Sequence, residues 1–125
     1  MSSKPKTMKI DDVEYIRKDS VDNYKKADSR DDMPFQMVRT YSAGVFFGYV
    51  ESRDGQEVVL RDATRVWSWS GAASLSQLSM EGTTSPNNCK FAMPVDKVEL
   101  LQAIEILDIS EKASKNLLSV KTWKL

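Results

Sequence analysis

The sequence predicts an α+β fold, a small, strongly bent antiparallel sheet or barrel with one or two short helices and an N-terminal arm. Residues 35–70 are rich in Val, Phe, Tyr and Trp and are interrupted by turn residues, which is typical of consecutive strands. Residues 1–33 are charged and hold little apolar pattern, although residues 9–21 are compatible with an outer strand. The domain organisation is therefore predicted as an arm at 1–33 and a single β-rich domain at 34–125.

The β-rich region contains turn signals that divide it into strands. SRDG at 52–55 predicts a hairpin turn in which Gly55 supplies a positive φ. Gly48 lies inside a strand, which indicates a bulge, a sharp bend or a closely approaching backbone. Bending of this kind is how short strands close into a small barrel. The strands are expected near 35–41, 44–51, 56–61 and 64–70.

The rest of the chain, residues 71–125, mixes helical and extended patterns. Gly82 is a suitable C-cap and Ser110 a suitable N-cap for short helices. The apolar run after Pro94 is ambiguous, and a strand is favoured only for its second half. Trp123 is expected to pack back on the domain. The predicted elements are a helix at 73–81, a strand near 89–93, a strand at 103–108 and a helix from Ser110 to about 118.

Composition excludes several classes of protein. In a chain of 125 residues with 41% hydrophobic and 29% charged residues, no apolar run approaches the roughly 18–20 residues of a membrane helix. The N-terminus lacks the apolar segment of a secretory signal. Cys89 is the single cysteine, so no internal disulfide forms and a reducing compartment is expected. These features predict a cytoplasmic protein that does not engage a membrane.

The same composition argues against catalysis. The chain has no histidine, which removes the usual ligands of zinc, haem and copper and the Ser-His-Asp and Cys-His pairs. We therefore expect no catalytic residue, no metal and no cofactor. Eighteen basic and eighteen acidic residues cancel, so no global field steers the domain toward nucleic acid.

The stretch RDATRVWSWSGAAS contains the most informative pattern. If residues 61–69 are extended, period two puts five side chains on one face: Arg61, Ala63, Arg65, Trp67 and Trp69. Buried unpaired charges are costly, so this face is open or its arginines pair with acids such as Glu51, Glu57 or Asp62. Indoles beside guanidinium groups can stack on a base and hold a phosphate, and each stacked base contributes about 1–3 kcal/mol.

Three interpretations of the tryptophans stay open: core packing, a subunit interface, or a small-ligand site. A bend at residues 62–64 would shift the alternation and turn the indoles inward while the arginines stay outside. The small residues that follow add Ser70 and Gly71 as an anion site at a helix N-terminus, with capping by Ser70 or Ser74 as the structural alternative.

The segments RTYSAG, VVLRDA, WSWSGA and SLSQL occur in this order and are followed by a final TW. In these segments the chain resembles a family of small proteins common in bacteriophage genomes, over roughly residues 36–123. The resemblance implies a phage or prophage accessory protein in the host cytoplasm and carries no known activity. A looser similarity, in the glycine-bent strand, the hairpin and VVLRDA, is to Sm-like and SH3-like barrels and serves as fold analogy only.

The resemblance and the Arg/Trp face together predict a non-enzymatic binding protein that forms homo-oligomers. It is expected to counter host antiviral defence by sequestering a nucleotide-derived, anionic small molecule or by blocking a host defence protein. A virion or assembly protein is the alternative, and single-stranded nucleic-acid binding ranks third. The expected ligand-binding residues are Arg39, Tyr41, Arg61, Arg65, Trp67, Trp69, Ser70 and Gly71.

Overall fold

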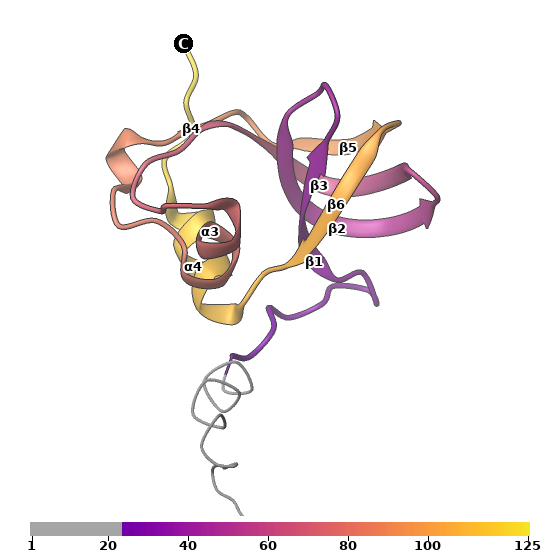
Figure 1. Ribbon diagram of the computed structural model, residues 1–125, viewed down its shortest axis with the longest axis horizontal. Helices are drawn as coiled ribbons and strands as arrows, with labels where there is room; N and C mark the ends of the chain where they lie inside the picture. The colour runs from indigo at the N-terminus through magenta and orange to yellow at the C-terminus, as the bar shows by residue number, and fades with distance from the viewer. Residues whose placement is uncertain (1–23) are drawn as a thin grey trace, which may run out of the picture.

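The computed structural model describes residues 24–125, whose centre is one six-stranded antiparallel sheet (Figure 1). Its main path runs in the order β4-β3-β2-β1-β6, and β5 pairs with β3 off this path. Because β2 occupies one edge of β3, β4 and β5 follow each other along the other edge. The strands are β1 (Phe35–Thr40), β2 (Val45–Asp54), β3 (Glu57–Ser68), β4 (Lys90–Phe91), β5 (Val95–Leu100) and β6 (Ala103–Asp108).

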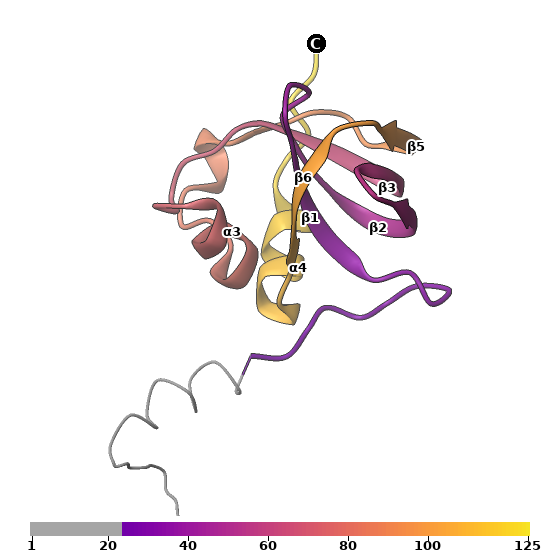
Figure 2. The same cartoon turned by 45° about the vertical axis from the view of Figure 1, so that its right-hand side comes forward.

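Two short helices lie together on one side of the sheet (Figure 2). Helix α3 (Leu75–Glu81) starts after Ser74, whose hydroxyl accepts a hydrogen bond from the amide of Gln77, and a 3-10 turn η1 (Pro86–Asn88) follows it. Helix α4 (Glu111–Ser119) starts after Ser110 in the same way. The Ser110 N-cap and the Gly82 C-cap were predicted, and Ser74 was one of two candidates for the N-cap of α3, because short hydroxyl side chains satisfy the first free amides of a helix.

Both sides of the sheet are buried, each by a different cluster. On the side that we call the helix side, Met37 and Phe47 pack with Leu78 and Leu117 of the helices. On the opposite side, the curl of the strands buries a second cluster, whose members are Val38, Phe46, Val58, Leu60, Ala63, Leu100 and Ala103. A small domain with two such clusters needs strands that are apolar on both faces. This explains why residues 35–66 are rich in Val and Phe.

The sheet remains open, so the closed barrel considered from the sequence is not formed. Within residues 24–125, no ladder joins β5 to β6. The chain leaves the edge of β3 at Leu100, turns at Leu101 and Gln102, and joins the edge of β1 at Ala103. An α+β fold with a strongly bent sheet is confirmed, whereas closure as in Sm-like barrels is not.

Two strand predictions differ from the structure. The strands expected at 56–61 and 64–70 are one strand, β3, with an irregularity inside it. Strand β5 was not predicted, because three of its six residues are charged and only Leu100 is buried. The short strand near 89–93 and the strand at 103–108 are present.

The described end of the predicted arm lies against the domain. The amide of Ala27 donates to the carbonyl of Ile109 at 2.9 Å, and the amide of Glu111 donates to the carbonyl of Lys25 at 2.6 Å. The guanidinium of Arg30 lies 4.1 Å from the ring centre of Tyr49. The outer strand expected at 9–21 falls outside the described residues. Among residues 24–125, no helix is long and apolar enough to cross a membrane.

Candidate functional site

A β-bulge in β3 decides where the predicted site residues point. Asp62 has a φ of +47°, and the pairing of β2 with β3 shifts register between Phe47 and Tyr49. The intervening Gly48 faces this bulge closely, since a Cβ there would lie 2.9 Å from the carbonyl oxygen of Arg61. The glycine therefore makes room for an extra residue, as the sequence indicated, and the alternation of β3 shifts by one position.

The bulge separates Arg61 from the rest of the predicted face. Arg61 pairs with Tyr49, which packs on the helix side of the sheet. Arg65 pairs with Phe46, which belongs to the cluster on the opposite side. Side chains of directly paired residues share a face, so Arg61 and Arg65 point to opposite sides. The prediction that residues 61, 63, 65, 67 and 69 share one face is therefore wrong at Arg61.

Arg61 and Arg39 form ion pairs with carboxylates. Arg61 lies 3.0 Å from a Glu51 oxygen and 3.3 Å from an Asp96 oxygen. Its hydrogen bond to Glu51 and the charge of Asp96 raise the pKa of the Arg61 guanidinium above its usual value. Arg39 donates to Glu105 at 2.8 Å across β1 and β6. The pairing of arginines with nearby acids, which the sequence left open, is confirmed for Arg61.

Trp69, Ser70 and Gly71 make packing contacts and hydrogen bonds within the domain. Trp69 packs against the helix-side cluster, and its indole N–H donates to the carbonyl of Ala72 at 3.2 Å. The Ser70 carbonyl accepts a hydrogen bond from the Thr83 hydroxyl. The Gly71 carbonyl accepts from the amide of Thr84 at 3.1 Å. These contacts anchor the segment that leads from β3 to α3.

The first turn of α3 is satisfied by its own side chains. Ser74 accepts from the amide of Gln77 at 3.1 Å, and the Gln77 side chain accepts from the amide of Ala73 at 2.7 Å. This reciprocal arrangement caps the helix. The structural alternative, capping by Ser74, is confirmed, and the anion site predicted at Ser70 and Gly71 has no support from the described geometry.

Trp67 has a different environment from Trp69. Its side chain is 62% exposed, and its ring stacks on that of Trp123 with centroids 6.1 Å apart and an interplanar angle of 22°. Trp123 is 48% exposed. It is held in place because its backbone amide donates to the carbonyl of Phe91 at 2.9 Å. Two indoles thus lie together at the surface, where β3, β4 and the C-terminal segment meet.

Two cations accompany the indole pair. The ammonium of Lys90 on β4 lies 5.3 Å from the ring centre of Trp123. Arg65 precedes Trp67 by two positions on β3, whose pairing with β4 shifts register between Val66 and Ser68, and its guanidinium lies 4.8 Å from the ring centre of Phe46. Among residues 24–125, no carboxylate lies within ion-pair distance of either cation. We call Arg65, Trp67, Lys90 and Trp123 the tryptophan surface.

The tryptophan surface keeps two of the predicted residues and adds two. Tyr41 is 77% exposed in the turn between β1 and β2, where its amide donates to the Gln102 carbonyl. It lies outside the tryptophan surface. Trp123 was expected to pack back on the domain, which is confirmed, but its pairing with Trp67 was not predicted. No local pattern joins residues 67, 90 and 123, because only the fold brings these segments together.

The tryptophan surface offers stacking and positive charge rather than acid–base chemistry. Within the described part of the chain, no group of three or more metal-ligating side chains comes together. Cys89 is buried, and its sulfur lies 3.6 Å from the Ser70 carbonyl and from the Thr83 hydroxyl. Exposed indoles with adjacent cations suit a flat ligand that carries negative charge.

Comparison with known proteins gives a family and no function. Neither the curated proteins nor the solved structures contain a match to this chain. Residues 35–117 match the family described as Domain of unknown function (DUF6948). The match spans every strand of the sheet and all of α3, and ends within α4. The chain therefore belongs to the DUF6948 family.

Proposed function

We propose that this protein acts by binding a nucleotide-like, anionic small molecule on the tryptophan surface. The observation that carries the proposal is the stacked and half-exposed pair of Trp67 and Trp123. Burial of apolar surface contributes about 25 cal/mol of free energy per Å². Two indoles that stay exposed lack this stabilisation, and a ligand that covers them would supply it. Exposed apolar patches of this kind mark binding sites.

The distribution of charge supports an anionic ligand. Arg39 and Arg61 are neutralised by carboxylates, whereas Arg65 and Lys90 have none nearby among residues 24–125. An incoming phosphate therefore meets positive charge at the tryptophan surface, although the whole chain has a formal net charge of +0. A planar base stacked on the indole of Trp123 would lie beside the ammonium of Lys90, which is 5.3 Å from that ring centre.

The similarity to phage-encoded proteins suggests the setting for this binding. Sequestering a nucleotide-derived signal in the host cytoplasm would counter an antiviral defence without catalysis, which fits a chain with no histidine and one cysteine. A homo-oligomer would present several copies of the tryptophan surface and would raise the effective affinity.

The test is titration of the protein with ATP, a cyclic dinucleotide and a single-stranded octanucleotide, followed by NMR of the indole N–H groups. We expect one of the two small ligands to shift the signals of Trp67 and Trp123 and to leave that of Trp69 in place. Arg65→Ala should weaken this binding by about tenfold, the magnitude of one charge-assisted hydrogen bond. Arg39→Ala serves as the matched control because its guanidinium is paired with Glu105.

Several results would overturn this proposal. One is the absence of any shift at Trp67, and another is equal weakening by Arg65→Ala and Arg39→Ala. Binding of the octanucleotide alone, with strong salt dependence, would assign single-stranded nucleic acid as the ligand instead. Circular dichroism of each variant separates loss of binding from loss of folding.

A second candidate is a protein contact, either with a host defence protein or within the virion. Exposed tryptophans with an adjacent arginine are also the residues that carry most binding energy at protein interfaces. Mass spectrometry of purified particles addresses the virion role, because an assembly protein remains in the particle and a host-directed protein does not. Loss of the effect on phage growth in Trp67→Ala, without nucleotide binding by the native protein, would favour a defence protein as the partner.

A further inference from the structure

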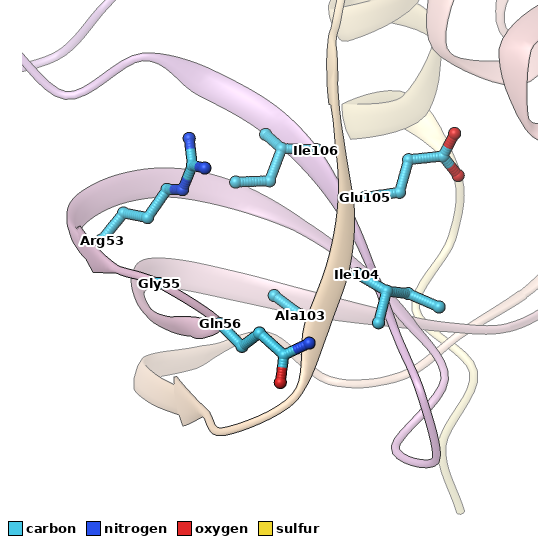
Figure 3. A pocket seen from close by; sticks show the side chains of 7 residues that line it. All are labelled: Arg53, Gly55, Gln56, Ala103, Ile104, Glu105 and Ile106. Atoms are coloured by element: carbon cyan, nitrogen blue, oxygen red, sulfur yellow. The ribbon is translucent and has the colours of Figure 1, made fainter.

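A cleft of about 550 Å³ lies between the turn that joins β2 to β3 and strand β6 (Figure 3). Arg53 near the end of β2 lines it together with Gly55 and Gln56 of the turn, and residues 103–106 line it from β6. Its volume falls within the range of roughly 300–1,000 Å³ in which binding sites are found. None of these residues belongs to the tryptophan surface, so the cleft is a separate feature.

The cleft runs along a free edge of the sheet. Within residues 24–125, β6 forms a ladder with β1 alone, and its other edge carries none. The amide of Ala103 donates to the carbonyl of Gln56 at 2.9 Å, at the end of β6 where the two segments meet. Four consecutive residues of β6 line the cleft, although Ile106 projects toward the turn and Glu105 projects away from it (Figure 3). A cleft that reaches residues pointing both ways exposes the backbone between them.

The side chains of the cleft combine apolar surface with one available cation. Ile106 packs against the second cluster, and Ile104 is 44% exposed. The carboxylate of Glu105 is held by Arg39. No carboxylate among residues 24–125 lies within ion-pair distance of Arg53. An occupant with an apolar part and a negative charge is therefore complementary to the cleft.

We propose that an extended peptide segment of a partner protein adds a strand to β6 in this cleft and places an acidic side chain against Arg53. Free N–H and C=O groups on a strand edge are a template for another strand, which supplies affinity through backbone hydrogen bonds. Alternate side chains of the added strand then face Ile106, which supplies selectivity for apolar residues. A small anion would satisfy Arg53 but would leave the backbone edge unpaired.

The test is selection of a random octapeptide library against the full-length protein. We expect enrichment of peptides that alternate apolar residues with an acidic residue. In NMR, a selected peptide should shift the amides of residues 103–106 and leave the indole signal of Trp67 in place. This readout is independent of nucleotide binding, so the two proposals fail or succeed separately.

Charge reversal gives the sharper comparison. Arg53→Glu should weaken a selected peptide by about tenfold or more, and selection on this variant should enrich basic peptides instead. Lys112→Glu makes the same charge change at an exposed position of α4, outside the cleft, and should leave binding unchanged. Thermal unfolding of both variants shows whether each is folded.

Four outcomes would overturn the peptide proposal. The first is the absence of an enriched peptide family, and the second is an equal effect of Arg53→Glu and Lys112→Glu on peptide binding. The third is the same set of amide shifts with hexanoate alone, which would identify a small carboxylate ligand. The fourth is a dimer in native mass spectrometry that Arg53→Glu abolishes, which would show that a second copy of the chain covers the edge.

Discussion

Two glycines, Gly44 and Gly71, differ in how closely the surrounding backbone approaches them. Gly44 and Gly71 both have positive φ, at 94° and 84°. A Cβ on Gly44 would have no atom within 4 Å, whereas a Cβ on Gly71 would lie 2.5 Å from the amide nitrogen of Ser85. Gly71 is thus required for close approach as well as for its conformation, and it sets the path from Trp69 to α3.

Gly71→Ala should therefore destabilise the protein more than Gly44→Ala. Both variants place a side chain at positive φ, but only Gly71→Ala forces the loop at 83–85 to move, and overpacking typically costs about 1–3 kcal/mol. Urea unfolding of the two variants measures this difference in free energy. Equal stabilities would show that the 83–85 loop moves away without cost and that the close approach is incidental.

At the residue scale, the sequence identified some of the candidate site. Arg65 and Trp67 belong to the predicted set and lie on the tryptophan surface. Trp69 was assigned to the same face, but β3 ends at Ser68 and the next indole turns into the helix-side cluster. Period two predicts side-chain direction only while the strand remains regular, so it fails beyond the end of the strand.

At the element scale, the bulge in β3 is the feature with the largest consequence. Asp62 adopts the left-handed region, which short polar side chains tolerate better than others do, and its carboxylate pairs with Arg30 at 2.5 Å. The extra residue lets β3 continue past Gly48 and carry Trp67 to the far end of the sheet. The sequence left a bend at residues 62–64 open as an alternative to a regular strand, because the irregularity depends on the approach of β2.

Replacement of Asp62 tests this account of the bulge. Asp62→Asn keeps a side chain that tolerates positive φ, whereas Asp62→Val introduces a branched side chain that does not. Both lose the charge that pairs with Arg30, so their difference isolates the backbone conformation. We expect the valine variant to be less stable by about 1–2 kcal/mol in urea unfolding. A valine variant as stable as the asparagine variant would contradict the left-handed conformation of residue 62.

Helices and strands were predicted best where local signals are strong. Ser110 begins α4 and residues 103–108 form β6, both as expected. Strand β5 has no such signal, since Asp96, Lys97 and Glu99 face solvent and its stability comes from pairing with β3. Local propensity cannot report a strand whose neighbour lies about forty residues away in the chain, because that contact depends on the completed fold.

At the scale of the whole molecule, the helix-side cluster joins elements from both ends of the chain. Phe35 from β1, Cys89 before β4 and Leu117 from α4 all belong to it. Asn116 of α4 adds polar contacts to the loop after α3. Its side chain accepts from the amide of Thr83 at 2.8 Å and donates to the carbonyl of Thr83 at 2.9 Å. These contacts predict that the sheet and the helices unfold together.

Cys89 provides a measure of that cooperativity. Its side chain is buried, so a thiol reagent reaches it only when the cluster opens. We expect iodoacetamide labelling, followed by mass spectrometry, to be slow in buffer and to accelerate with urea in parallel with the loss of the circular dichroism signal. Rapid labelling in buffer, with the circular dichroism signal intact, would show that the loop at 83–89 opens independently of the core.

The amino-acid sequence is sufficient to predict an α+β domain and most of the strand and helix positions. These properties follow from local chemistry: side-chain periodicity, turn residues and helix caps. Three other features depend on tertiary structure: the open edge of β6, the opposite directions of Arg61 and Arg65, and the stacking of Trp67 on Trp123. They require contacts between segments that are distant in the chain, and such contacts exist only after the two hydrophobic clusters have formed.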